Sequence, residues 1–100
     1  MKLETGGDSH ANPSADLLAA AIDSLDVDDT LTLLESDEEF LDAIRLDDTR
    51  YGVQFREGGL EDMWSDSGSG IDKETLKSLF MSYLSGDGAW RTAIAWERSS

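Results

Sequence analysis

The stretch of residues 51–97 constrains the fold most, because strand and helix periodicities both occur within it. Its apolar patterns predict four elements: strands over 51–56 and 61–65, a helix over 72–84 and a last strand over 92–97. Strands joined by short polar turns pair antiparallel, and an amphipathic helix covers one face of such a sheet. The stretch therefore predicts an α+β domain.

A tight hairpin is predicted between the first two of these strands. Gly58-Gly59 supplies the positive backbone angles that a two-residue turn needs. The resulting register places Val53 opposite Trp64 and Arg56 opposite Glu61, which are favourable cross-strand pairs. The inward face of the first strand consists of Tyr51, Val53 and Phe55.

The helix predicted in this stretch has a signal at each end and a buried face between them. Asp72 caps the free amides of the first turn, and Gly86 suits the left-handed position after the last one. The apolar stripe consists of Leu76, Leu79, Phe80, Tyr83 and Leu84. Because this stripe must cover the last strand, we expect it to share a core with Ile94 and Trp96.

Residues 1–11 show no periodicity and are rich in glycine and polar side chains, so we expect a disordered tail. The tail contains the single histidine, His10, which nothing would then orient for acid–base chemistry. Asn12-Pro13 opens a helix, with Ser14 as the alternative cap. The folded domain is therefore expected to span residues 12–100.

This first helix is expected to end near Leu25, and two strands follow it. Residues 30–35 are rich in strand formers, and residues 40–46 alternate as a strand does, although Phe40, Leu41 and Ile44 also permit a short helix. The predicted order is α-β-β-β-β-α-β. We expect one small domain in which an antiparallel sheet of about four to five strands carries two helices on one face.

Acidic side chains dominate the composition: the formal net charge is −14. Such a field repels phosphate backbones and anionic membranes, so we expect no nucleic-acid or membrane partner. The charge favours a basic protein as partner; the alternative is that it serves solubility. The residues expected to meet such a partner crowd the polar turns and are Asp28, Asp29, Asp37, Glu38, Glu39, Asp47 and Asp48.

Familiar site patterns do not occur at the required spacing. A calcium loop that starts at Asp26 would hold Leu31 where glycine is needed, and one that starts at Asp66 would hold Ile71. The glycines before the second helix lack the Gly-Lys-Ser/Thr ending of a phosphate loop, and the chain has no cysteine. We therefore expect no cofactor, no metal site and no catalytic residue.

Three motifs make the second half similar to a group of small uncharacterised bacterial proteins. They are Val53-Gln54-Phe55-Arg56-Glu57-Gly58 in the hairpin, Tyr83-Leu84-Ser85-Gly86-Asp87 at the end of the helix, and the closing Trp90-Arg91 with Trp96-Glu97. The resemblance covers about half the chain. It implies no catalytic residue, and comparable α+β families include suspected immunity proteins of bacterial toxin systems. It thus implies an inhibitor or immunity-type protein.

Together these observations predict a non-catalytic, acidic protein-interaction module. One alternative is a small-ligand-binding domain with a pocket between helix 72–84 and the sheet, and another is an enzyme that uses carboxylates in a cleft. The N-terminus lacks a signal pattern and no apolar run is long enough for a membrane span, so we expect a cytoplasmic protein. A monomer and a weak dimer both remain open.

Overall fold

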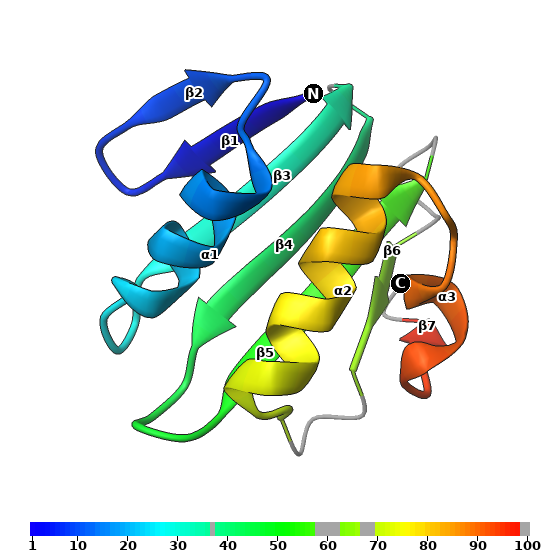
Figure 1. The fold of residues 1–100 in the computed structure, drawn as a ribbon. Coiled ribbons are helices and arrows are strands. Elements are labelled where there is room, and N and C mark those ends of the chain that lie inside the picture. The colour runs from blue at the N-terminus through cyan, green and yellow to red at the C-terminus, as the bar shows by residue number, and fades with distance from the viewer. Residues whose placement is uncertain (37, 58–62, 67–69, 99–100) are drawn as a thin grey trace.

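An antiparallel sheet forms one layer of the molecule, and the helices α1 and α2 cover one of its faces (Figure 1). The computed structural model describes residues 1–36, 38–57, 63–66 and 70–98. The strand order is β2-β1-β3-β4-β5-β6-β7. In chain order the elements are β1 (Lys2–Thr5), β2 (Ser9–Ala11), α1 (Ala15–Asp23), β3 (Thr30–Ser36), β4 (Glu39–Arg45), β5 (Tyr51–Glu57), β6 (Met63–Ser65), α2 (Lys73–Ser85), α3 (Trp90–Ala93) and β7 (Glu97–Arg98).

The predicted fold class is confirmed, although the described residues contain seven strands and three helices rather than five strands and two helices. The three central strands bury one side each, as their alternation predicts. The inward residues are Leu31, Leu33, Leu41, Ala43, Tyr51, Val53 and Phe55, none more than 6% exposed. The ambiguous segment 40–46 is a strand as far as Arg45, because its successive residues pair with β3 on one side and with β5 on the other.

The second helix matches its prediction at both ends. The Asp72 side chain accepts a hydrogen bond from the backbone N–H of Thr75 at 2.8 Å, and Gly86 adopts a φ of 77° after the last turn. Its buried residues are Leu76, Leu79, Phe80, Ser82 and Tyr83. Leu84 is only partly buried, so the apolar stripe is slightly narrower than predicted.

The first helix begins later than Asn12-Pro13 suggests. Ser14, the alternative, is the cap, and its hydroxyl accepts a hydrogen bond from the N–H of Leu17 at 3.1 Å. Asn12 adopts a left-handed φ of 51° instead, and its side chain accepts a hydrogen bond from the amino group of Met1. Asn12 therefore belongs to the hairpin that precedes the helix. The helix ends at Asp23, two residues before the predicted Leu25.

The prediction of a disordered tail over residues 1–11 is wrong. β1 and β2 form a hairpin, and β1 continues the sheet by pairing with β3 from Lys2↔Leu34 to Thr5↔Leu31. The Leu3 side chain is 0% exposed and belongs to the core. A strand of four residues with one inward apolar side chain leaves too little periodicity to detect, so the tertiary contact of Leu3 decides its structure.

The predicted last strand over 92–97 is also wrong. Trp90–Ala93 is a short helix, and extended pairing begins only at Glu97. The buried hydroxyl of Ser82 accepts a hydrogen bond from the N–H of Trp90 at 2.9 Å, which fixes the start of this turn. This contact with α2 therefore outweighs the strand preference that the alternating pattern indicates. Ile94 and Trp96 only border the core and are partly buried.

The hairpin register differs from the prediction by two residues. Trp64 pairs with Phe55 rather than Val53, and Arg56 pairs with Met63. The rings of Phe55 and Trp64 stack with their centres 6.2 Å apart. A shift by two keeps the same side chains inward, so the aromatic contact selects between two otherwise equivalent registers. The predicted turn at Gly58-Gly59 and the partner residue Glu61 lie outside the described residues.

None of the helices that the structure describes is both long and apolar enough for a transmembrane segment.

Replacing Leu3 by alanine tests the docking of the N-terminal hairpin. We expect Leu3→Ala to lower the free energy of unfolding by about 2–5 kcal/mol, because a fully buried leucine is lost and a cavity remains. Urea titration followed by tryptophan fluorescence measures this change. Leu17→Ala is the matched control, since Leu17 is 36% exposed on α1 and should have a much smaller effect. Equal midpoints for Leu3→Ala and the unmodified protein would show that the hairpin is not docked.

Candidate functional site

The structure separates the seven carboxylates predicted to meet a partner into two groups. Four lie at one end of the sheet, where the turn before β3 meets the turn between β4 and β5 (Figure 1). These four, here named the acidic end, are Asp28, Asp29, Asp47 and Asp48. Glu38 and Glu39 lie at the opposite end, beside the turn between β3 and β4, and Asp37 is outside the described residues. No single acidic face therefore contains all of the predicted residues.

Backbone hydrogen bonds hold the turn of the acidic end that precedes β3. The N–H of Asp28 donates to the carbonyl of Arg45 at 2.8 Å, and the N–H of Arg45 donates to the carbonyl of Asp29 at 3.1 Å. Asp28 adopts a left-handed φ of 71°, which turns the chain into the strand. The ladder between β3 and β4 thus extends into the turn and fixes where Asp28 and Asp29 lie.

The guanidinium of Arg45 joins the two turns. It donates to the carbonyl of Leu25 at 2.6 Å, to that of Asp47 at 3.1 Å and to that of Asp48 at 3.0 Å. Its central carbon also lies 5.7 Å from the centre of the Tyr51 ring. Because Arg45 binds backbone carbonyls, it orders both turns without forming an ion pair with their carboxylates.

Asp47 differs from the other three carboxylates because its oxygens hold its own turn together. Its side chain accepts hydrogen bonds from the backbone N–H groups of Thr49 and Arg50, each at 2.9 Å, and from Nε of Arg50 at 2.7 Å. These bonds, led by that from Thr49, lower the pKa of Asp47 to about 2. Asp28, Asp29 and Asp48 are exposed and form no ion pair with another described residue. Three carboxylates of the acidic end thus project into solvent from a fixed backbone.

The opposite end of the sheet is less uniformly acidic. Glu39 pairs with Glu57 across β4 and β5, and Arg91 forms an ion pair with Glu57 through its two terminal guanidinium nitrogens, Nη1 and Nη2. Arg91 also lies 4.8 Å from the centre of the Trp90 ring. A cation from α3 therefore offsets part of the negative charge near Glu39.

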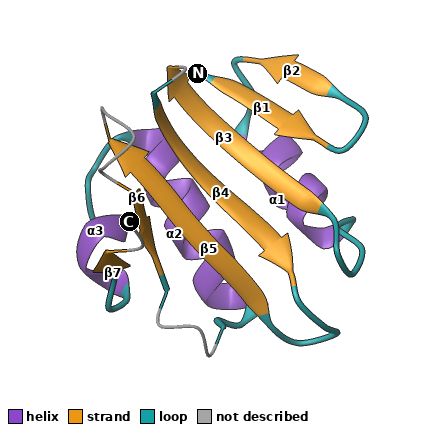
Figure 2. Cartoon of the chain, turned by 180° about the vertical axis from the view of Figure 1, so that it is seen from behind, coloured by secondary structure: helices purple, strands orange, loops and turns teal. Residues whose placement is uncertain are grey.

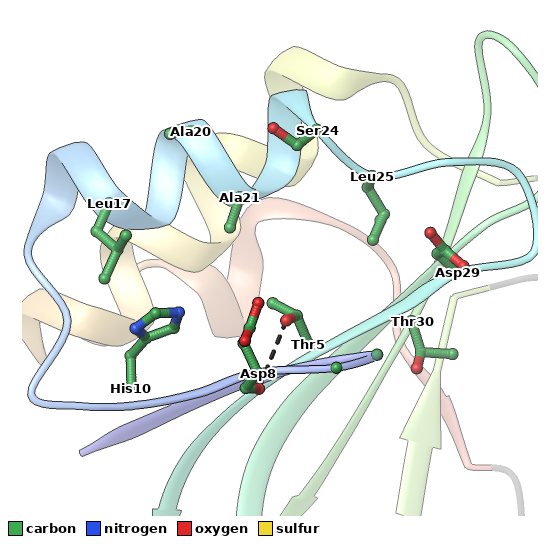
Figure 3. Close-up of a pocket in the computed structure, with 12 residues that line it drawn as sticks. Thr5, Asp8, His10, Leu17, Ala20, Ala21, Ser24, Leu25, Asp29 and Thr30 are labelled. Carbon is green, nitrogen blue, oxygen red and sulfur yellow. Dashed lines mark hydrogen bonds between the residues drawn. The ribbon is translucent and has the colours of Figure 1, made fainter.

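An open groove of about 550 Å³ lies beside the acidic end, between the N-terminal hairpin and α1 (Figure 3). His10 and Asp8 line it from the hairpin, Leu17 lines it from the helix, and Asp29 borders it where β3 begins. β2 positions His10, contrary to its predicted place in a disordered tail. No described hydrogen bond orients the imidazole, and among the described residues no cluster of acidic or histidine side chains is arranged to hold a metal ion.

Side chains fill the interface between the second helix and the sheet, where the alternative prediction places a ligand pocket. Leu76, Leu79 and Phe80 point from α2 into this interface, and each is 0% exposed. Tyr51 from β5 is equally buried. Close packing of these side chains occupies the volume that a ligand would need.

Comparisons with protein-family models, with curated proteins and with solved structures gave no match. The resemblance of the three motifs to small bacterial proteins therefore stays a prediction.

Sequence reasoning identified the acidic turn residues but missed the residue that organises them. Arg45 lies inside the strand predicted over 40–46 and received no role, because its carbonyl partners are up to 20 residues away in the chain. The one signal in the sequence was an isolated arginine among aspartates. The groove at His10 was missed for a different reason: the hairpin that forms one wall was predicted to be disordered.

Replacing Arg45 tests the link between the two turns. We expect Arg45→Met, which keeps an apolar stem, to lower the free energy of unfolding by about 1.5–3 kcal/mol, because three carbonyls lose a charged donor. Amide hydrogen exchange should accelerate at residues 26–29 and 46–50. Arg50→Met is the control, since Arg50 is exposed and such ion pairs contribute about 0–1 kcal/mol. If the two variants behave alike, Arg45 does not join the turns.

The acid stability of the fold should depend on Asp47. Its pKa is about 2 in the folded protein and about 3.9 in an unfolded chain, so its carboxylate stabilises the fold fully above the unfolded value. This contribution is lost as the pH falls from about 4 to about 2. Urea titrations across this range should show a shallower loss of stability for Asp47→Asn than for the unmodified protein. Asp48→Asn serves as the neighbouring control, and equal pH profiles for all three proteins would contradict the role of Asp47.

Proposed function

We propose that the protein is a non-catalytic interaction module that binds a basic protein through its acidic end, as an inhibitor or immunity-type protein does. The observation that carries the proposal is the fixed backbone beneath Asp28, Asp29 and Asp48, which Arg45 holds from both turns. Side chains on an ordered backbone lose less conformational freedom on binding, so more of the contact energy remains as affinity.

The overall charge supports the same partner. At a net charge of −14 the protein attracts a basic surface from a distance, which raises the association rate more than it slows dissociation. Exposed carboxylates that form no ion pair contribute most to this attraction. Asp28, Asp29 and Asp48 meet this description among the described residues, although the guanidinium of Arg45 lies beneath their turns. At the opposite end Glu57, which lies beside Glu39, is ion-paired with Arg91.

The immunity-type role rests on the three sequence motifs as well as on the charge. A bacterial immunity protein neutralises a toxin inside the cell that makes it, so the proposal places the protein in the cytoplasm. Such a protein acts by covering its partner, and an ordered acidic surface suits that task without a catalytic group. A basic toxin domain is then the expected partner.

Association kinetics test the proposal. The tagged protein is first used to isolate a basic partner from its host. Stopped-flow measurements should then show an association rate that falls by about tenfold or more between 20 and 200 mM salt, because exposed charges are screened over about 10 Å. The triple variant Asp28→Asn, Asp29→Asn, Asp48→Asn should slow association about fivefold and change dissociation less.

The matched control is a variant with neutral side chains at the end of the sheet opposite the acidic end. Glu38→Gln together with Glu39→Gln removes two exposed carboxylates far from the acidic end and should leave the association rate within about twofold of the unmodified value. An association rate indifferent to salt and to the triple variant would leave the negative charge as a solubility device. A stronger effect of the control than of the triple variant would move the interface to the opposite end.

A further inference from the structure

Within the part of the chain that the structure describes, no helix covers the face of the sheet opposite α1 and α2 (Figure 2). A depression of about 340 Å³ opens on this face, over the middle strands β4 and β5. We name it the Gly52 pocket; its defining residues are Asp42, Ile44, Gly52, Gln54 and Asp66. None of the four carboxylates of the acidic end lines this pocket. Thr30 lines it, however, and follows Asp29 directly in the chain. The pocket therefore reaches the first residue of β3, next to the turn that carries Asp29.

Gly52 opens the floor of this pocket, although its backbone does not require glycine. The pairing of β4 with β5 runs without a register shift, so the strand has no bulge at this point. Gly52 is also absent from the residues with a positive φ. A Cβ here would lie 3.3 Å from Cγ2 of Ile44 and 3.8 Å from Oδ1 of Asp66. A glycine inside a regular strand often marks a close approach of another group, and here the missing side chain leaves space on the exposed face.

Asp42 places a fixed carboxylate on the pocket wall. Its Oδ1 accepts a hydrogen bond from the Thr32 hydroxyl at 2.8 Å, and its Oδ2 accepts one from the Gln54 amide at 3.0 Å. Both donors are neutral, and Asp42 forms no ion pair with another described residue. Each carboxylate oxygen has a second lone pair, so Asp42 retains acceptor capacity toward a cation.

Asp66 adds a second carboxylate at the rim, and its position is equally determined. Its oxygens accept hydrogen bonds from the backbone N–H of Val53 at 3.2 Å and from that of Gly70 at 3.1 Å. The remaining wall includes the polar Thr30, Gln54 and Ser65 and the apolar Ile44, which is 36% exposed. Leu46, which is 40% exposed, lies close to Gly52. The pocket thus combines two fixed negative charges with an exposed aliphatic surface.

We propose that the Gly52 pocket receives an arginine side chain of the basic partner. The guanidinium binds the carboxylate of Asp42, and the aliphatic stem lies along Ile44 over the backbone of Gly52. Arginine fits better than lysine, because its planar guanidinium offers two parallel donors to a carboxylate and is more weakly hydrated. The inference rests on the proposed function, since it specifies which side chain of the basic partner is recognised.

Titration with a small arginine compound tests the pocket without the partner. We expect Nα-acetyl-arginine methylamide, added to the ¹⁵N-labelled protein at low salt, to shift the amide signals of Gly52, Val53 and Gln54 in a saturable way. The citrulline analogue has the same shape without the charge and should cause no such shifts. Asp42→Asn and Gly52→Ala should each raise the dissociation constant about fivefold or more, the first by removing charge and the second by filling the floor.

Two further measurements keep the result interpretable. Asp16→Asn removes an exposed carboxylate on α1, outside both the pocket and the acidic end, and should bind the arginine compound as the unmodified protein does. Urea titration of each variant verifies that it is folded; if Gly52→Ala is not, Asp42→Asn decides alone. Equal shifts from the citrulline analogue, or unchanged binding to both pocket variants, would overturn the proposal. These results would overturn the pocket alone. The proposed function is tested separately, by the salt dependence of partner association, so the two failures are distinguishable.

Discussion

Burial of one face of the sheet beneath α1 and α2 is the constraint on which the rest of the structure depends. The inward side chains of β1, β3, β4 and β5 form a single apolar core with the two helices. A chain of 100 residues with 30% charged side chains has enough apolar surface for one such layer, and the opposite face stays open. That open face carries polar rows such as Thr32, Asp42 and Gln54, whose side chains bond to one another. The Gly52 pocket is therefore a consequence of one-sided packing.

The same constraint concentrates charge at the ends of the sheet. Acidic residues cannot be buried without partners, so they gather in the turns that connect the layers. Turns crowded with carboxylates repel one another, and two guanidinium groups offset this repulsion: that of Arg45 binds carbonyls, and that of Arg50 binds the carboxylate of Asp47. Arg45 reaches from the end of β4 to Leu25 on one side and to Asp48 on the other. Its positive charge lowers the repulsion energy between the carboxylates of these turns, while the carboxylates themselves stay exposed to solvent.

The two proposed contacts act at different distances. The acidic end attracts a basic surface over the range of the screened field, whereas the Gly52 pocket recognises one side chain at contact. Thr30 connects them, because it lines the pocket and follows Asp29 in the turn. A partner steered to the acidic end would therefore meet the pocket without a further rearrangement. Such a division between steering and recognition is common where charged proteins bind tightly.

The sequence by itself determined the α+β class, the three central strands and both caps of α2. These features depend on local patterns: alternation along β3, β4 and β5, and the side chain of Asp72 three residues before Thr75. It also identified the acidic turns as the surface of interest, since charge and turn residues are visible without a structure. Neither the motifs nor the fold class assigns a partner.

Only the tertiary structure decided the rest, because the deciding contacts join residues far apart in the chain. Leu3 forms a strand through its place beside Leu33, and the stacking of Phe55 on Trp64 selects the hairpin register. Trp90 enters a helix because Ser82, eight residues earlier, accepts its N–H. The same holds for the candidate sites: the acidic end needs Arg45 to bind Leu25, and the Gly52 pocket needs the four strands β3 to β6 side by side. Local propensity cannot encode such contacts, since each one exists only after the sheet has formed.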